Sequence, residues 1–360
     1  MKRLITVVLA LALVFALTAC TEKAPETTPA PQEPTKAPTD TEPTAEPAPE
    51  MTKIRVGYHT NLGGAGCVIT CEKMGYFAEE GLEVELVPFT SGPPEIAAMS
   101  SGDLQFAYIG NGAHALAING KAEIIAPLQI GNSEKIIARK DSGISTLADL
   151  KGKKVATTFG TSGEAIVDLA LEKAGLERGT GKDQVNVINM ETGGCVTAII
   201  AGQVDAVCVW EQYLVSVNEG LGDNAVTLAE TIDFKDKYIA ISSYLTTEKL
   251  MQKDPELCQR FVNALEKGLK YQEANQEEVA KWVAELIKVD EAVVLKGVGS
   301  AEFLTPEKIK TMMEDGTLDQ IFQLQQDKFI SAEKVDGKVP LNEYLHLDFI
   351  KKAVDKAMAE

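Results

Sequence analysis

The sequence predicts an α/β protein whose folded part has two lobes, each a mainly parallel sheet flanked by helices, joined by a hinge of two strands. Three observations lead to this prediction. Strand-like and helix-like segments alternate along residues 53–129, the same rhythm restarts at residue 154, and the residues beyond 246 have mostly helical spacing. Such alternation is typical of parallel sheets covered by helices, and the restart indicates a second sheet.

The chain of 360 residues begins with a targeting segment, residues 1–20. Lys2 and Arg3 precede an apolar stretch at 4–17, and Leu-Thr-Ala-Cys at 17–20 has the form of a lipobox. An uncleaved membrane anchor is disfavoured because the stretch is shorter than the roughly 20 residues of a spanning helix. We therefore expect lipidation of Cys20 and an extracytoplasmic protein on the cell membrane, at the cell surface or in the periplasm according to the envelope.

Residues 21–50 have the composition of a disordered tether. They hold eight of the fifteen prolines and no Val, Ile, Leu or aromatic residue, so they lack the side chains from which a core is built. Proline at this density favours extended polyproline II. The folded part is therefore expected to begin at Met51.

The formal net charge is −18, and most of it lies on the folded part. Such a body repels nucleic acid and anionic lipid, so we expect no nucleic-acid partner and membrane contact through the lipid anchor only. It also repels anionic ligands at long range. Any anion site must therefore be made by local groups.

The first lobe is expected to begin with four strands and three intervening helices. Its strands alternate polar and apolar residues or are continuously apolar, and its helices repeat apolar residues every three or four positions. In chain order these are strand 53–58, helix 67–78, strand 83–89, helix 94–101, strand 104–109, helix 113–119 and strand 123–129.

The same reasoning gives the second lobe and the carboxyl-terminal helices. The second lobe contains strands 154–158, 185–189 and 206–210 and helices 163–174 and 195–201. Amphipathic helices follow at 255–274, 276–287, 306–314, 318–328 and 345–358. We assign residues 51–137 plus 246–360 to the first lobe and 138–245 to the second. The connecting strands lie near Ala138 and Ser242, and a cleft lies between the lobes.

Five loops rich in Gly, Ser, Thr and Asn each follow a predicted strand and lead into a helix. They are residues 61–66, 90–92, 110–112, 160–163 and 192–194. In open α/β sheets this edge binds ligands, because helix N-termini present free N–H groups and a partial positive charge. Ordinary helix capping explains any single loop equally well. Five together favour a binding site.

The sequence offers no catalytic constellation. There are three histidines, neither GxSxG nor HExxH occurs, and no loop carries a complete phosphate-binding fingerprint. We therefore expect no catalytic residues, no cofactor and no metal, and a protein that is not an enzyme. His59 and His114 lie at predicted strand and helix ends, where they either line the cleft or serve as turn and helix-start residues. For Trp210, after the strand at 206–209, ligand contact is favoured over core packing.

Five cysteines remain besides Cys20, and their odd number argues against a complete disulfide framework. Cys67 and Cys71 share a helix face at i, i+4, and Cys195 begins a helix in the other lobe. Convergence of these three on the cleft, as a soft-metal site or a disulfide, is one interpretation. Small buried or capping residues are the favoured one.

Three strings carry a resemblance to a known family. They are KMGYFAEEGLEV at 73–84, LADLKGKKVA at 147–156 and AGQVDA at 201–206, followed by Trp210-Glu211. In this order and spacing, behind a lipobox, they resemble the nitrate, sulfonate and taurine class of ABC-transporter solute-binding proteins, which includes thiamine-pyrimidine binders. The resemblance covers about residues 53–285. It implies the two-lobed periplasmic-binding-protein fold of type II, closing on a small molecule.

The resemblance also implies where the ligand lies. In such proteins it is contacted by residues after the first strand, after the third strand and at helix starts of the second lobe. On this chain these positions, with Cys67 at the first helix start added, are His59, Asn61, Gly66, Cys67, Asn111, Gly112, Thr161, Ser162, Thr192, Gly193 and Trp210. The family's proline two residues after the tryptophan is Gln212 here.

The leading functional hypothesis is capture of a small organic anion, such as taurine or another alkanesulfonate, and its delivery to an ABC permease and ATPase. A neutral heterocycle such as a thiamine pyrimidine precursor, stacked on Trp210, is the alternative, since no arginine lies in a predicted pocket loop. A pyrimidine-forming enzyme of the same fold and a ligand sensor without transport remain open. The family implies a monomer, because lobe motion needs free surfaces.

Overall fold

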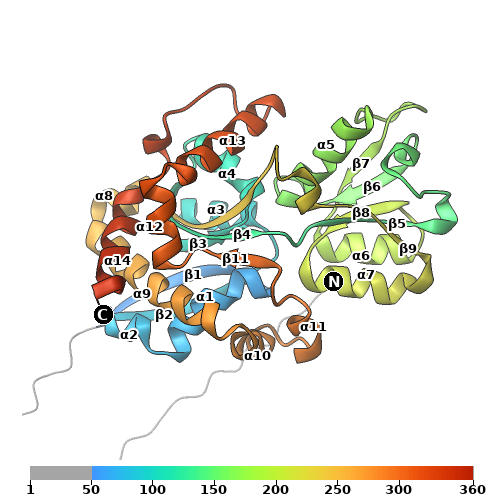
Figure 1. The fold of residues 1–360 in the computed structure, drawn as a ribbon. Helices are drawn as coiled ribbons and strands as arrows, with labels where there is room; N and C mark the ends of the chain where they lie inside the picture. Colours follow the sequence, from blue (N-terminus) through green and yellow to red (C-terminus); the bar gives the residue numbers. More distant parts are fainter. Residues whose placement is uncertain (1–50, 360) are drawn as a thin grey trace, which may run out of the picture. The chain divides into compact units, whose positions relative to one another are not determined.

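The structure, a computed structural model, describes residues 51–359 (Figure 1). They belong to one compact unit, Pro49–Glu360. The predicted signal segment at 1–20, the lipidation of Cys20 and the tether at 21–50 lie outside the described residues. None of the described helices is both long and apolar enough to cross a membrane.

The first sheet has six strands in the order β11-β4-β10-β3-β1-β2. Strand β1 pairs in parallel with β2 and β3, whereas β10 pairs antiparallel with β3 and β4, and β11 antiparallel with β4. Thus β1 to β4 share one direction and β10 and β11 oppose it. The strands are β1 Thr52–His59, β2 Leu82–Phe89, β3 Phe106–Ile109, β4 Glu123–Gly131, β10 Ala240–Thr246 and β11 Ala301–Phe303.

The second sheet has five strands in the order β7-β6-β8-β5-β9. Strand β6 pairs in parallel with β7 and β8, and β5 pairs antiparallel with β8 and β9. Four strands therefore share one direction and β5 opposes them. The strands are β5 Lys135–Arg139, β6 Lys154–Thr157, β7 Asn186–Asn189, β8 Ala206–Val209 and β9 Ala225–Glu230.

The chain passes between the sheets twice, from Gly131 to Lys135 and back between Glu230 and Ala240. We call the first sheet with its helices lobe 1 and the second with its helices lobe 2 (Figure 1). Strands β5 and β10 each follow a crossing. They start at the edge of the sheet where the parallel strands end, so they run in the opposite direction. The expected α/β architecture with two sheets is confirmed, but both sheets are mixed rather than mainly parallel, because β5, β10 and β11 run against the other strands.

Within the described residues, fourteen α-helices surround the sheets, eleven of them in lobe 1 and three in lobe 2. Lobe 1 has α1 Leu62–Lys73, α2 Tyr76–Glu79, α3 Gly92–Ser101, α4 His114–Ile118, α8 Glu248–Lys253, α9 Pro255–Ala274, α10 Gln276–Ile287, α11 Glu291–Leu295, α12 Pro306–Glu314, α13 Thr317–Ser331 and α14 Leu347–Ala359. Lobe 2 has α5 Ser162–Ala174, α6 Thr192–Ile200 and α7 Glu211–Leu221.

Two helices begin three or more residues earlier than predicted. Helix α1 begins at Leu62, because the Asn61 side chain caps it by accepting a hydrogen bond from the Gly64 N–H at 2.7 Å. Helix α6 begins at Thr192. Residues that the sequence analysis placed in loops therefore lie inside helical turns.

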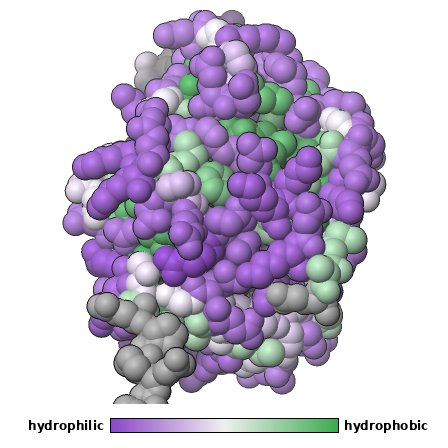
Figure 2. All heavy atoms as spheres, turned by 90° about the vertical axis from the view of Figure 1, so that its left-hand side faces the viewer, coloured by the Kyte–Doolittle hydropathy of each residue, from purple (hydrophilic) through white to green (hydrophobic). Residues whose placement is uncertain are grey.

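Each lobe has its own hydrophobic core. The core of lobe 1 includes a stack of Phe106 on Phe261, with ring centroids 4.0 Å apart, between the sheet and α9. Lobe 2 has one core on the α5 side of its sheet and another against α6 and α7. Figure 2 shows one face of the molecule as mostly hydrophilic, with smaller hydrophobic areas between polar side chains. Each lobe thus folds around its own core, and the contacts between the lobes are separate from these cores.

Candidate ligand-binding site

A small cavity lies between the lobes, with a volume of about 50 Å³. Lobe 1 contributes the ends of β1, β3 and β4 and the starts of α1 and α3, and lobe 2 contributes the start of α5 and the β8–α7 junction. Room for a water molecule takes at least about 10–15 Å³ on this measure. The cavity therefore admits only a small molecule, and the two lobes lie close together around it.

Six of the eleven residues predicted to contact ligand line this cavity. They are His59, Asn61, Asn111, Thr161, Ser162 and Trp210. Each lies at a strand end or in the first turn of a helix. The remaining five, Gly66, Cys67, Gly112, Thr192 and Gly193, are not part of the cavity wall.

Gly66 and Cys67 face the core of lobe 1. Because α1 begins at Leu62, both residues lie in its second turn, against α9. A Cβ at Gly66 would lie 2.1 Å from the Nε2 of Gln272, and the Cys67 thiol donates to the Leu265 carbonyl at 3.5 Å. The small side chains at Gly66 and Cys67 therefore allow α1 and α9 to pack closely.

The other three positions lie near the cavity but face elsewhere. The Thr192 hydroxyl is 3.0 Å from that of Thr158, within lobe 2. Gly193 has open space around its Cα. Gly112 forms a contact between the lobes, since a Cβ there would lie 2.0 Å from the carbonyl carbon of Thr161. Gly112 thus affects closure of the lobes rather than the cavity surface.

The cysteines do not converge on the cavity. Cys67 and Cys71 belong to the core of lobe 1 and Cys195 to that of lobe 2, where its thiol faces the Met190 carbonyl. Burial raises the pKa of Cys195 to about 12, so it stays a thiol at neutral pH. Among residues 51–359, no group of three or more His, Cys, Asp or Glu is arranged to hold a metal ion.

The main feature that the sequence analysis missed is Glu211, the first residue of α7. Its carboxylate reaches across to lobe 1, where it accepts hydrogen bonds from the Leu62 N–H at 2.8 Å and the Gly63 N–H at 3.3 Å. The Glu211 backbone has a φ of +43°, a conformation that non-glycine residues rarely adopt. Burial raises the pKa of this carboxyl to about 7, although the two N–H groups oppose the shift. The sequence signal was the Trp210-Glu211 pair directly after a strand.

A second buried acid lies behind the cavity wall. The Glu95 carboxylate in α3 is fully buried and lies 2.7 Å from the Nε2 of His59. Burial raises the pKa of Glu95 to about 7, while the neighbouring His59 lowers it in part. The His59 ring also meets the Tyr108 ring edge-on at 5.1 Å. His59 is therefore held in place from two sides.

The cavity wall is rich in hydrogen-bond acceptors. Its acidic side chains are those of Glu134 and Glu211, and its lining residues include no Lys or Arg. The Asn111 Nδ2 donates to the Ile239 carbonyl at 3.0 Å, which turns its Oδ1 away, and this buried oxygen has no protein partner. The Oε1 of Gln129 is likewise unpaired. Such groups suit a ligand that donates hydrogen bonds.

Comparison with known proteins agrees with this architecture. Residues 65–279 match the model of the family described as NMT1/THI5 like. The chain belongs to the NMT1/THI5-like family. A candidate binding protein of Brucella abortus is 30% identical over 296 residues, which cover 82% of this chain and 91% of that protein. A candidate aliphatic sulfonates-binding protein of Bacillus subtilis is 27% identical, covering 85% and 90%.

Solved structures show the same fold. The periplasmic aliphatic sulphonate binding protein of Escherichia coli superimposes with a TM-score of 0.62 at 20% identity, covering 82% of this chain and 92% of that one. A desulfurization enzyme has a TM-score of 0.61 at 15% identity, covering 85% and 99%. The resemblance stated from the sequence is thus confirmed for family and fold. This NMT1/THI5-like chain has the two-lobed periplasmic-binding-protein fold, which binding proteins and at least one enzyme share.

Proposed function

We propose that this NMT1/THI5-like protein is an extracytoplasmic solute-binding protein of an ABC importer. It captures a small molecule between its lobes and delivers it to a permease and ATPase, and Cys20 anchors it to the membrane. The support is the small cavity enclosed by both lobes, together with relatives that are named as binding proteins. A ligand that contacts both lobes favours the closed form, which gives a permease a state to recognise.

For the ligand we propose a small nitrogenous heterocycle, such as a thiamine pyrimidine, that donates hydrogen bonds to the cavity wall. The observation that carries this proposal is the surplus of acceptors: the Glu211 carboxylate and the unpaired oxygens of Asn111 and Gln129. An aminopyrimidine supplies N–H donors to such groups and a flat face to the ring of Trp210. Buried acceptors that find donors in the ligand also discriminate strongly against ligands without them.

The position of Glu211 supports placing the heterocycle ahead of the sulfonate. A sulfonate at the N-terminus of α1 would compete with this carboxylate for the Leu62 and Gly63 N–H groups. Two like charges 4 Å apart repel by about 4 kcal/mol at an effective dielectric constant of about 20. A simple alkanesulfonate is therefore disfavoured at this helix where Glu211 is ionised, which means above its pKa of about 7.

Taurine is the second candidate, because it carries an ammonium group as well as a sulfonate. Its ammonium would pair with Glu211, and its sulfonate would meet the starts of α3 or α5. The capping residues of these helices, Ser91 and Thr161, line the cavity, and neither side chain caps its own helix. The backbone N–H groups at the starts of α3 and α5 are therefore open to an anion from the cavity side.

A thermal-unfolding and calorimetric panel on residues 51–360, refolded without ligand, tests the proposal. The probes are 4-amino-5-hydroxymethyl-2-methylpyrimidine, taurine, ethanesulfonate and nitrate. A ligand at about 100 times its Kd adds roughly 2.7 kcal/mol of stability. Stabilisation by the pyrimidine and not by ethanesulfonate supports the heterocycle, whereas stabilisation by ethanesulfonate or nitrate alone contradicts it. Glu211→Gln should weaken any ligand that donates to this carboxylate.

The remaining alternatives have their own tests. Conversion of pyridoxal phosphate to a pyrimidine in the presence of iron would indicate the enzyme of the same fold. Genes for a permease and an ATPase beside this one favour transport, and their absence favours a sensor.

A further inference from the structure

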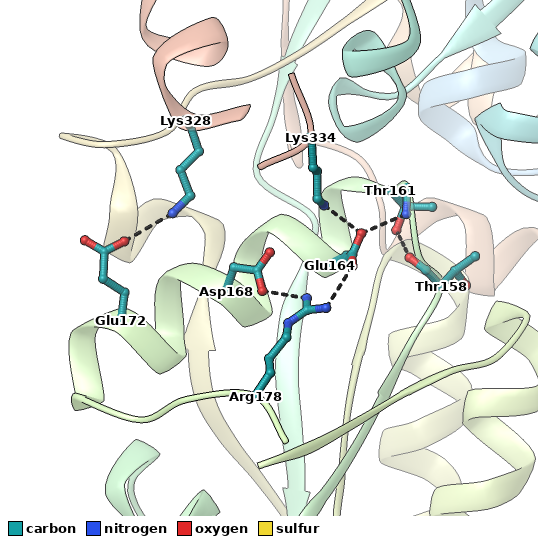
Figure 3. A network of polar contacts seen from close by, with 9 residues as sticks. Thr158, Thr161, Glu164, Asp168, Glu172, Arg178, Lys328 and Lys334 are labelled. Atoms are coloured by element: carbon teal, nitrogen blue, oxygen red, sulfur yellow. Dashed lines mark hydrogen bonds and ion pairs between the residues drawn. The ribbon is translucent and has the colours of Figure 1, made fainter. Parts of the chain in front are cut away.

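Helix α5 of lobe 2 carries a row of acidic side chains, two of which meet lysines of lobe 1 (Figure 3). Glu164, Asp168 and Glu172 are spaced four residues apart, so they share one face of the helix. Two lysines of lobe 1 reach this face. Lys334, in the segment after α13, lies 2.6 Å from a Glu164 carboxylate oxygen, and Lys328, in α13, lies 3.1 Å from Glu172.

These two ion pairs exist only while the lobes are together. The lysines belong to elements packed on the core of lobe 1, and the Asn119 side chain donates to the Lys334 carbonyl at 2.9 Å. Glu164 has a second partner inside lobe 2, since Arg178 lies 2.9 Å away. Opening would therefore leave Glu164 paired with Arg178 and return Lys334 to water.

Burial makes the Glu164–Lys334 pair stronger than an ordinary surface pair. The Glu164 side chain is 7% exposed and that of Lys334 22%. Exposed pairs contribute little, because water and salt screen them. Although burial raises the pKa of Glu164, the Lys334 ammonium, the Gly160 N–H and Arg178 hold it below its usual value. The carboxylate is thus ionised at neutral pH in this arrangement.

Glu164 also connects this pair to the cavity. Its Oε2 accepts a hydrogen bond from the Gly160 N–H at 2.8 Å, and residues 160–162 line the cavity. Gly160 has a φ of +74°, and the hydroxyl of Thr161 donates to the Thr158 carbonyl at 2.6 Å. One carboxylate therefore contacts both the lysine of the opposite lobe and the loop that faces the ligand (Figure 3).

We propose that Glu164 is a positioning residue and that Glu164–Lys334, with Glu172–Lys328 beside it, is a latch between the lobes. The latch favours the closed form before ligand binds, and it holds residues 160–162 in the conformation that meets the ligand. Its effect on affinity rests on the proposed function, whereas its effect on closure does not.

Small-angle X-ray scattering of residues 51–360 without ligand, at low and high salt, tests the latch. We expect the wild type to be compact at low salt and to expand as salt rises. Lys334→Gln combined with Lys328→Gln should be expanded already at low salt. Lys334→Arg should stay compact, since it keeps the charge. The matched control is Lys237→Gln, because Lys237 pairs with Glu172 from the segment that packs on lobe 2.

The second readout is affinity for the pyrimidine and for taurine. The double variant should lose about fivefold or more, which is the lower end of typical coupling between sites, with little change in the control. Equal radii of gyration for the double variant and the control, with circular dichroism showing both folded, would overturn the latch. If neither probe binds the wild type, the proposed ligands fail, and the scattering result still decides whether the latch exists.

Discussion

Substitution of Gly112 by alanine should block closure of the lobes while leaving each lobe intact. A Cβ at this position would lie 2.0 Å from the Thr161 carbonyl carbon, 2.3 Å from its oxygen and 2.5 Å from the Ser162 nitrogen. All three atoms are backbone atoms of the opposite lobe. Gly112 does not have a left-handed conformation, so alanine strains nothing within lobe 1.

The size of the effect follows from these distances. Carbon atoms in contact are about 3.5–4.0 Å apart, so the lobes must separate by roughly 1.5 Å at this point. Such a shift breaks short contacts across the cleft, including that of the Gln212 Nε2 with the Thr60 carbonyl at 2.6 Å. Overpacking of this kind costs about 1–3 kcal/mol, which corresponds to about a 5- to 150-fold loss of affinity.

Three measurements test this effect. They are the calorimetric affinity for the ligand identified in the panel, small-angle X-ray scattering without ligand, and the melting temperature of the free protein. We expect weaker binding, a larger radius of gyration and an unchanged melting temperature. Gly193→Ala is the matched control, because Gly193 is not part of the cavity wall and has open space around its Cα. Wild-type affinity and radius in Gly112→Ala would refute the assignment of this contact to closure.

Three further predictions concern the cavity and its buried acids. Because burial raises the pKa of Glu211 to about 7, its carboxylate is mostly protonated at pH 6 and mostly ionised at pH 8. Affinity for a hydrogen-bond donor should rise about tenfold over this range and become flat in Glu211→Gln, as calorimetry at both pH values will show. Burial likewise raises the pKa of Glu95 from 4.5 to about 7, so the stability it contributes is complete below about pH 4.5 and lost as pH rises to 7. Between pH 4.5 and 7 the free energy of unfolding of the wild type, measured in urea, should fall by up to about 3 kcal/mol, and Glu95→Gln should remove this fall. If the variant shows the same pH dependence as the wild type, the raised pKa of Glu95 is wrong. Trp210→Ala should weaken binding with little loss of stability, whereas a loss of about 3–5 kcal/mol would mean that Trp210 serves only packing.

Local signals in the sequence determined most elements of this fold. The bounds of α9 and α10 were predicted correctly, because Asp254 caps a helix with proline at its first position and Asn275 separates the two. The alternation of strands and helices predicted that parallel strands end at one edge. For that reason His59 and Asn111, at the ends of two strands of the first sheet, were expected together, and both line the cavity that Thr161 of the second lobe completes.

Other features depend on contacts between distant residues, which one-dimensional patterns do not carry. The reversed direction of β5 and β10 follows from where the chain re-enters each sheet. Glu211 contacts Leu62 across 149 positions, and Lys334 contacts Glu164 across 170. Their burial and pKa values exist only once the lobes meet. The sequence by itself therefore predicted two α/β lobes and the sheet edges at which we propose that a ligand binds. Only the tertiary structure places the Glu211 carboxylate at these edges and pairs Lys334 and Lys328 of one lobe with acids of the other, because these contacts depend on how two separately folded lobes come together.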